Sequence, residues 1–253
     1  MGIYAMTGGA TGIGAAIKQR LRGAGHTVIV ADVKDADVIA DLGTRAGRES
    51  AIEGIRSRAG AGLDGIVACA GLGGHVPDRA LVASVNYFGA VDVVEGLKDL
   101  VAAHKGAVVL ISSNSAPMPT SEEFVNRLLE GNEEAARALA NGMQGHPVYS
   151  GSKLALARWM RRNTPGYAAL GVRLNAVAPG YTETPMTEQV AKDPAMGDAI
   201  RAFLASIPLR RPGKPDDIAA AVSYLLGPEA SFVCGSVLFV DGGHDAMLRP
   251  DQF

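Results

Sequence analysis

The sequence Thr7-Gly8-Gly9-Ala10-Thr11-Gly12-Ile13-Gly14 lies between a short apolar run, Gly2–Met6, and an amphipathic stretch, Gly14–Gly23. Glycines at positions 8, 12 and 14 permit a tight turn and let the backbone approach a pyrophosphate closely. The N-terminus of the following helix then offers free N–H groups and a positive dipole end to phosphate oxygens. These residues therefore predict a strand–turn–helix unit that binds a dinucleotide.

The rest of the chain continues this alternation of short apolar runs and longer amphipathic stretches. Short runs that are apolar on both faces are typical of buried parallel strands, and their alternation with helices predicts right-handed βαβ units. We therefore expect an α/β Rossmann fold, a single domain over residues 1–253, with a doubly wound, mostly parallel, seven-stranded sheet covered by helices on both faces. The later strands are expected at Thr27–Ala31, Asp37–Leu42, Gly65–Ala70, Ala107–Ser112, Val172–Val177 and Ser236–Val240, and the later helices at Arg45–Arg58, Leu81–Ala103, Tyr149–Arg162 and Pro215–Leu226.

Two long connections depart from this alternation. Residues 117–145 form a predicted helical insert, and residues 181–213 form a predicted substrate lid. Both follow strands at their carboxyl ends, which is the edge where open α/β sheets bind ligands. Connections of this length inside a compact domain are usually functional. We expect their apolar side chains to shape a substrate pocket, the candidates being Met118, Met186, Met196 and Phe203.

Composition excludes several classes of protein. The 253 residues carry 24 Lys and Arg against 26 Asp and Glu, so no basic surface for nucleic acid or anionic lipid is expected. No apolar run reaches the ~18 residues of a transmembrane helix, and no secretory leader is evident. The only cysteines, Cys69 and Cys234, match no metal or redox spacing. We expect a cytoplasmic protein without a metal and without nucleic-acid or membrane partners.

An acidic residue, Asp32, follows the second expected strand directly. A carboxylate there accepts hydrogen bonds from an adenosine ribose and repels a 2′-phosphate. The glycine loop itself carries no basic residue, so NAD(H) is favoured over NADP(H), although Lys34 leaves the alternative open. Asp41 and Leu42 follow the third short strand and are expected to border the adenine; the alternative for Asp41 is a solvated loop acid.

A second group of polar residues lies further along the chain. Tyr149 and Lys153 are four residues apart, which places both on one face of a helix. Ser112 and Ser113 close an earlier strand, and Asn86 lies in the expected helix before it. Asn, Ser, Tyr and Lys in this order, beyond a TG-x-x-x-G-x-G loop, resemble the short-chain dehydrogenase/reductase family, and the resemblance extends over essentially the whole chain.

Further motifs narrow the resemblance to the bacterial 3α-hydroxysteroid dehydrogenase/carbonyl reductases. One departure is that the family often has Asn-Asn-Ala-Gly after its fourth strand, whereas this chain has Ala68-Cys69-Ala70-Gly71. The loss of two amides puts the rigidity of the sheet in question there. The insert before Tyr149 also matches this group, and the matching motifs are Ser84–Gly89, Tyr149–Lys153, Val172–Asn175, Glu183–Pro185 and Asp245–Pro250.

The resemblance implies hydride transfer between a nicotinamide and a secondary alcohol or ketone. The expected substrate is a 3α-hydroxysteroid or another bulky hydrophobic carbonyl compound. Tyr149 is expected to act as the general acid/base, since a cation such as Lys153 within ~4–6 Å would favour its phenolate. Ser113 is expected to orient the substrate oxygen, and Asn86 to position a water molecule that links Lys153 to solvent.

The same resemblance implies a set of cofactor contacts. Lys153 is expected to hold the nicotinamide ribose, and Thr182 and Thr184 the carboxamide. The full set of expected cofactor-binding residues is Gly8, Thr11, Gly12, Ile13, Gly14, Asp32, Asp41, Leu42, Ala70, Gly71, Lys153, Pro179, Gly180, Thr182 and Thr184.

Three points stay open at this level. The substrate is alternatively a small carbonyl compound or a cyclic alcohol, because family membership does not fix the substrate. The chain is alternatively a catalytically silent dinucleotide-binding module. We expect a homodimer, with a tetramer as the alternative, because the insert at 117–145 could obstruct one surface on which relatives pair.

Overall fold

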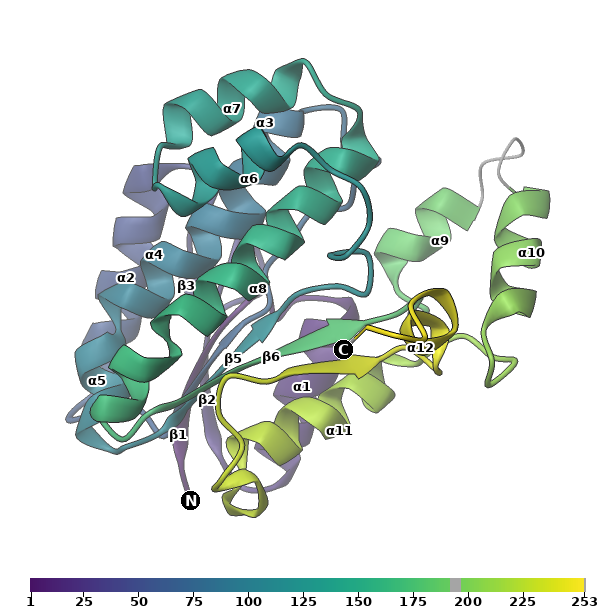
Figure 1. The fold of residues 1–253 in the computed structure, drawn as a ribbon. Helices are drawn as coiled ribbons and strands as arrows, with labels where there is room; N and C mark the ends of the chain where they lie inside the picture. The colour runs from purple at the N-terminus through teal and green to yellow at the C-terminus, as the bar shows by residue number, and fades with distance from the viewer. Residues whose placement is uncertain (192–196, 253) are drawn as a thin grey trace.

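The computed structural model describes residues 1–191 and 197–252. Within these residues one parallel sheet has the strand order β3-β2-β1-β4-β5-β6-β7 (Figure 1). The predicted α/β fold with seven strands is confirmed, and the strand bounds differ from the prediction mostly by one or two residues. The strands are β1 (Ile3–Thr7), β2 (Thr27–Asp32), β3 (Val38–Ile39), β4 (Gly65–Ala68), β5 (Ala107–Ile111), β6 (Arg173–Pro179) and β7 (Val237–Val240).

Side chains that alternate along β1 divide the interior into two cores. Ala5 belongs to one hydrophobic cluster, whereas Tyr4 and Met6 belong to the other, since successive side chains of a strand point to opposite faces. The first cluster is covered by α2 (Arg45–Ala59), α4 (Gly89–Gly96) and α8 (Gly145–Ala169), and the second by α1 (Gly12–Gly23) and α11 (Pro215–Leu226). Figure 1 shows these two helical layers on opposite sides of the sheet.

The topology places a crevice at the carboxyl end of β1. This strand pairs with β2 on one side and with β4 on the other, so the order of the strands reverses there. Helices that leave β1 and β4 cover different faces, and the connections separate at this edge. Ligands of open α/β sheets bind in such a crevice.

The predicted helix over Leu81–Ala103 forms with one interruption, at Leu97. It begins as α3 (Arg79–Ala83), continues without a break through a π-helical turn over Ser84–Phe88 into α4, and resumes after Leu97 as α5 (Lys98–Ala103). A π turn inserts an additional residue into a helix, and the sequence pattern did not reveal it because this stretch has no exposed polar face whose shift could be seen. All five residues of the turn are buried, which places Asn86 in the interior.

Helix α8 extends further than the predicted Tyr149–Arg162. It continues to Ala169 although Pro165 lies inside it. Side chains satisfy carbonyl groups around the proline: Asn163 donates to the carbonyl of Trp159, and Thr164 to that of Met160, each across 2.9 Å. These bonds add to the turn before the proline, which itself lacks the N–H that would bond to the carbonyl of Arg161.

The insert is helical, as predicted: it forms α6 (Glu122–Leu129) and α7 (Glu133–Asn141) and ends where α8 begins at Gly145. Ser121 and Asn132 cap the two helices through their side chains. Helix α6 packs on α8, and α7 on α3 (Figure 1). The buried guanidinium of Arg48 joins the insert to the domain, since its Nε lies 2.7 Å from Asp92 and its Nη1 3.1 Å from Glu133.

The remaining elements follow β6. The lid contributes α9 (Pro185–Ala191) and α10 (Gly197–Ser206), which project from the carboxyl edge of the sheet in Figure 1. A short 3-10 turn, η2 (Pro228–Ala230), precedes β7, and α12 (His244–Leu248) follows it. Among the described residues, no helix combines the length and hydropathy needed to span a bilayer.

Candidate active site

The turn between β1 and α1 has the close backbone approach that its glycines predict. Gly8 has φ of 74°, and a Cβ there would lie 2.5 Å from the backbone nitrogen of Ala70. A Cβ on Gly14 would lie 1.6 Å from the carbonyl oxygen of Gly8. Thr11 precedes α1 without capping it through its side chain, so the first N–H groups of the helix remain available to an anion.

Asp32 is held between the glycine turn and the end of β2. Its Oδ2 accepts the N–H of Ala10 at 3.0 Å, and its Oδ1 accepts the N–H of Val33 at 2.7 Å. Asp41 accepts the N–H of Gly43 at 2.9 Å through its own Oδ1. Both carboxylates line the same cavity, so Asp41 borders the site despite being exposed.

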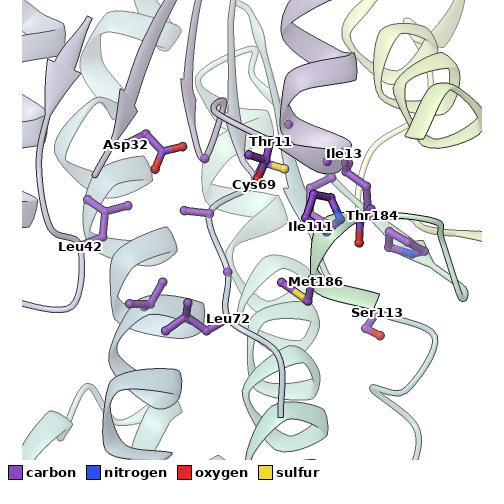
Figure 2. Close-up of a pocket in the computed structure, with 18 of the residues that line it drawn as sticks. Thr11, Ile13, Asp32, Leu42, Cys69, Leu72, Ile111, Ser113, Thr184 and Met186 are labelled. Carbon is purple, nitrogen blue, oxygen red and sulfur yellow. The ribbon is translucent and has the colours of Figure 1, made fainter. Parts of the chain in front are cut away.

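One cavity of about 380 Å³ extends along the carboxyl ends of the strands. Every residue expected to bind the cofactor lines it, and so do Ser113 and Tyr149. Figure 2 shows Asp32 and Leu42 toward one end and Ser113 and Met186 toward the other. The structure therefore places the glycine turn, Asp32 and the polar group of the later strands along one continuous cavity.

Several lining residues were not predicted. Leu81 and Val85 are spaced like neighbours on a helical face, and this spacing, next to the expected adenine side, is the signal that could have identified them. The others follow or precede residues that were predicted. The lining residues that were not predicted to contact the cofactor or the substrate are Val33, Ala40, Cys69, Leu72, Leu81, Val85, Ile111, Ser112, Pro185 and Thr187.

Helix α8 brings Tyr149 and Lys153 against the end of β5. The Nζ of Lys153 donates to the carbonyl of Ile111 at 2.9 Å, and Ser112 Oγ donates to the carbonyl of Lys153 at 3.0 Å. Lys153 Nζ lies 5.9 Å from the centre of the Tyr149 ring. The Ser–Tyr–Lys group expected from the sequence is thus assembled at one place, with Lys153 buried and Tyr149 half-buried.

Burial shifts the pKa values of Tyr149 and Lys153 in opposite directions. Desolvation raises the pKa of Tyr149 above its ordinary value, and a hydrogen bond from Ser113 acts in the opposite direction. Burial also lowers the pKa of Lys153 to about 8. The expectation that Lys153 lowers the pKa of Tyr149 is therefore not met in the protein alone, where desolvation is the larger effect. Tyr149 is protonated at neutral pH.

Asn86 lies behind the cavity rather than in its lining. Its Oδ1 accepts the N–H of Leu72 at 2.7 Å, and its Nδ2 donates to the carbonyl of Leu72 at 3.0 Å and to Ser152 Oγ at 3.2 Å. Both amide hydrogens are used within the protein. The side chain therefore clamps the loop after β4 to α8, and it has no hydrogen left to donate to a water molecule.

The departure at Cys69 leaves the neighbouring backbone well held. Thr7 Oγ1 accepts the N–H groups of both Cys69 and Ala70, each at 3.2 Å. The loss of rigidity suggested by the missing amides is thus countered from β1. Burial raises the pKa of the Cys69 thiol to about 12, so the thiol stays protonated and unreactive.

The lid begins with two threonines that line the cavity. Thr182 donates to the carbonyl of Gly180 at 3.0 Å, and Thr187 donates to the carbonyl of Thr182 at 2.7 Å. The N–H of Thr184 donates to Thr187 Oγ1 at 2.9 Å. Local hydrogen bonds therefore hold this strand end in place, and Thr187 is a member of the site that its sequence did not indicate.

Of the apolar side chains expected to shape the substrate pocket, only some line the cavity. Met186 lines the cavity, whereas Met118 and Phe203 do not. Phe203 instead packs edge-on against the ring of His244, with ring centres 4.8 Å apart, and Met196 lies outside the described residues. In the part of the chain that the structure describes, no three His, Cys, Asp or Glu side chains gather in a way that could hold a metal ion.

The fold and the cavity define a nucleotide-dependent oxidoreductase. A family model described as short chain dehydrogenase matches residues 3–125, and one described as enoyl-(acyl carrier protein) reductase matches residues 134–245. The chain belongs to the short-chain dehydrogenase/reductase family, as its motifs indicated.

Its relatives include 3α-hydroxysteroid dehydrogenases, the group that its motifs resemble. The 3-alpha-hydroxysteroid dehydrogenase/carbonyl reductase of Comamonas testosteroni is 41% identical over 259 residues, covering 100% of both chains. The cis-4-hydroxycyclohexanecarboxylate dehydrogenase of Sinomonas cyclohexanicum is 32% identical over 97% of both. The crystal structure of 3-alpha-hydroxysteroid dehydrogenase from Pseudomonas sp. B-0831, complexed with NADH, is 45% identical and superposes with a TM-score of 0.95, covering 99% of this chain and 100% of that one.

Proposed function

We propose that the protein transfers a hydride between NAD(H) and a secondary alcohol or ketone, with 3α-hydroxysteroids and other bulky hydrophobic carbonyl compounds as substrates. The observation that carries this proposal is the single cavity lined at one end by Asp32 and at the other by Ser113 and Tyr149. The similarity to the Comamonas enzyme supports the substrate class, and the NADH complex of the Pseudomonas enzyme supports the cofactor.

The residues present fit a dinucleotide. The glycine turn leaves no room for a Cβ and exposes the start of α1, where a pyrophosphate would be held by backbone N–H groups. Asp32 would accept hydrogen bonds from the adenosine ribose, which favours NAD(H) over NADP(H). Lys153, Thr182 and Thr184 would hold the nicotinamide end. The nicotinamide, when bound, supplies the carbon that gives or takes the hydride.

Tyr149 exchanges the proton with the substrate oxygen. Because burial keeps its phenol protonated at neutral pH, Tyr149 is ready to donate a proton when a ketone is reduced. Alcohol oxidation requires the phenolate, which a nearby positive charge favours. Ser113 donates a hydrogen bond that holds the substrate oxygen beside Tyr149. Asn86 hydrogen-bonds to Leu72 and to Ser152, and so holds the loop after β4 against α8. This contact keeps Ser113 and Tyr149 in place relative to each other.

A substrate panel tests this proposal. NADH formation or loss should be followed with 3α-hydroxysteroids, small ketones and cyclic alcohols, and Tyr149→Phe should serve as the inactive control. We expect the largest kcat/KM for steroids and at least about a hundredfold loss in the variant, because a positioned acid/base contributes that much. Tyr149→Phe should still bind NADH nearly as well as the native enzyme, and near-native turnover in this variant would contradict the assignment of Tyr149.

Two other outcomes of the panel have clear meanings. Preference for cyclic alcohols over steroids would favour the alternative substrate class, which the similarity to the Sinomonas dehydrogenase supports. NADH binding without turnover of any compound would favour a silent dinucleotide-binding module.

We further propose that the enzyme is a cytoplasmic homodimer. Helices α6 and α7 of the insert pack on α8 and α3 and so cover surface that would otherwise be open to a second copy. Both cysteines are free thiols, which suits a reducing compartment. Light scattering tests the assembly, and a tetrameric mass would contradict it.

A further inference from the structure

Ser113 occupies the first position of a tight turn. The N–H of Ala116 donates to the carbonyl of Ser113 at 3.1 Å and closes the turn. Within it, the N–H of Ser115 donates to Ser113 Oγ at 3.2 Å, which is the side-chain hydrogen bond of an ST turn. The hydroxyl of Ser115 then makes a second contact, since its Oγ lies 2.8 Å from Ser113 Oγ.

These two contacts restrict the hydrogen bonds that Ser113 can make. A hydroxyl has one hydrogen to donate and two lone pairs to accept with. The Ser115 amide fills one lone pair. If the Ser115 hydroxyl donates to the other, the single hydrogen of Ser113 is left for the side of the cavity that holds Tyr149. If Ser113 donates to Ser115 instead, that hydrogen is no longer available to Tyr149 or to the substrate.

The turn holds Ser115 where it can act. The N–H of Asn114 donates to the carbonyl of Pro179 at 2.9 Å, and the N–H of Met118 donates to the carbonyl of Ser115 at 2.9 Å. The turn is therefore tied to β6 and to the start of the insert. Ser115 is half-buried, which limits the competition from water for its hydroxyl.

We propose that Ser115 is a positioning residue that donates its hydroxyl hydrogen to Ser113 and thereby directs the single hydrogen of Ser113 into the cavity, to Tyr149 in the free enzyme and to the substrate oxygen in the complex. The proposal rests on the proposed function. The chain Ser115–Ser113–Tyr149 stabilises the phenolate form of Tyr149, because a hydrogen bond to the charged form of an acid favours that form, and successive bonds polarise one another.

The test compares Ser115→Ala with Ser115→Thr, which keeps the hydroxyl, and with Ser115→Val, which has the shape of Thr without it. In alcohol oxidation, the pH at which kcat/KM reaches half its plateau should rise by about half a unit in the Ala and Val variants. Their kcat should fall about fivefold, while KM for NAD⁺ stays unchanged. Ser115→Thr should restore both the profile and kcat.

A matched control removes another serine hydroxyl from the same connection. Ser121→Ala deletes the cap of α6 without touching Ser113, and it should leave the pH profile in place. An unchanged profile in Ser115→Ala, or a shift to lower pH, would overturn the proposal, because a shift to lower pH means that Ser113 donates to Ser115.

A measurement without turnover separates this proposal from the proposed function. The tyrosinate absorbance of each protein minus that of its Tyr149→Phe counterpart isolates the titration of Tyr149. We expect a higher pKa of Tyr149 in Ser115→Ala than in the native protein. If the native enzyme oxidises no alcohol, the proposed function fails and this titration still decides the role of Ser115. If it oxidises alcohols and both titrations coincide, only the role of Ser115 fails.

Discussion

The ammonium group of Lys153 donates to the carbonyl oxygen of Ile111, and this 2.9 Å bond joins the helix that carries Tyr149 to the end of β5. The bond lies in a buried setting that lowers the pKa of Lys153 to about 8. A buried cation opposes folding unless it is well paired. The candidate active site thus contains a buried charge that reduces the stability of the fold and for which we propose a role in the reaction.

Replacement of this lysine should separate the two effects. Lys153→Met should lower kcat/KM for alcohol oxidation at least about a hundredfold, since the charge beside Tyr149 is lost. The same variant should raise Tm at pH 7 by about 2–4 °C, because an apolar side chain removes the cost of the buried charge. Calorimetry at several pH values provides the measurement.

The pH dependence of this gain in Tm follows from the pKa of Lys153 in the folded protein and its pKa in the unfolded chain. In the folded protein the pKa is about 8, whereas in the unfolded chain it is about 10.4. Between these values unfolding takes up a proton, so the native protein becomes more stable as pH rises. The advantage of Lys153→Met should be complete below pH 8 and shrink toward pH 10. A lower Tm for the variant at pH 7 would contradict the prediction.

Asp32 should decide between the two nicotinamide dinucleotides. Asp32→Ala should raise the dissociation constant of NADH about tenfold and lower that of NADPH, because the variant loses the ribose acceptors and the repulsion of a 2′-phosphate. Fluorescence titration measures both constants. Asp41→Ala is the matched control, since Asp41 lines the same end of the cavity and should affect both dinucleotides alike. A native enzyme that prefers NADPH would refute this reading of Asp32.

Two glycines of α1 form a matched pair. Gly14→Ala places a Cβ 1.6 Å from the carbonyl oxygen of Gly8, whereas a Cβ on Gly23 meets no atom within 4 Å. Gly14→Ala should abolish NADH binding, because the turn must open to admit the methyl group. Gly23→Ala should bind normally and be stable. Equal NADH affinity in both variants would show that the turn is not the pyrophosphate site.

Glu133 should be important for holding the insert on the domain. Its carboxylate pairs with the buried Arg48, so Glu133→Ala leaves a buried cation with Asp92 as its partner. We expect a loss of about 2 kcal/mol in the free energy of unfolding, below the value for a fully buried pair because Glu133 is partly exposed. Glu134→Ala, in the same turn of α7 and exposed, should cost less than about 0.5 kcal/mol. Urea denaturation distinguishes the two.

The sequence allowed the fold and the cavity lining to be predicted because both depend on local patterns. The alternation of apolar runs defines the strands of a parallel sheet, and topology then brings residues such as Asp32 and Tyr149 to one edge without further information. The residues expected to bind the cofactor or to take part in catalysis accordingly line the cavity, with the exception of Asn86.

The sequence could not show properties that depend on the surroundings of a residue in the folded chain. The π turn at Ser84–Phe88 lies within a continuous helix, and all five of its residues are buried, so no polar face in the sequence marked the additional residue. The proton affinity of Tyr149 depends on how deeply three-dimensional packing buries it. The hydrogen bonds of Asn86 depend on Leu72 and Ser152, which are distant in sequence and meet only in the folded chain.

The parallel sheet also has a consequence for the speed of folding. Its central ladders pair Tyr4 with Gly65 and Ala107 with Arg173, so each can form only after a long loop has closed. Parallel strands have no tight hairpin from which pairing could begin, and non-local pairing slows folding. We therefore expect slow refolding from denaturant, in which the apolar strands remain exposed long enough for aggregation to compete unless the protein is dilute.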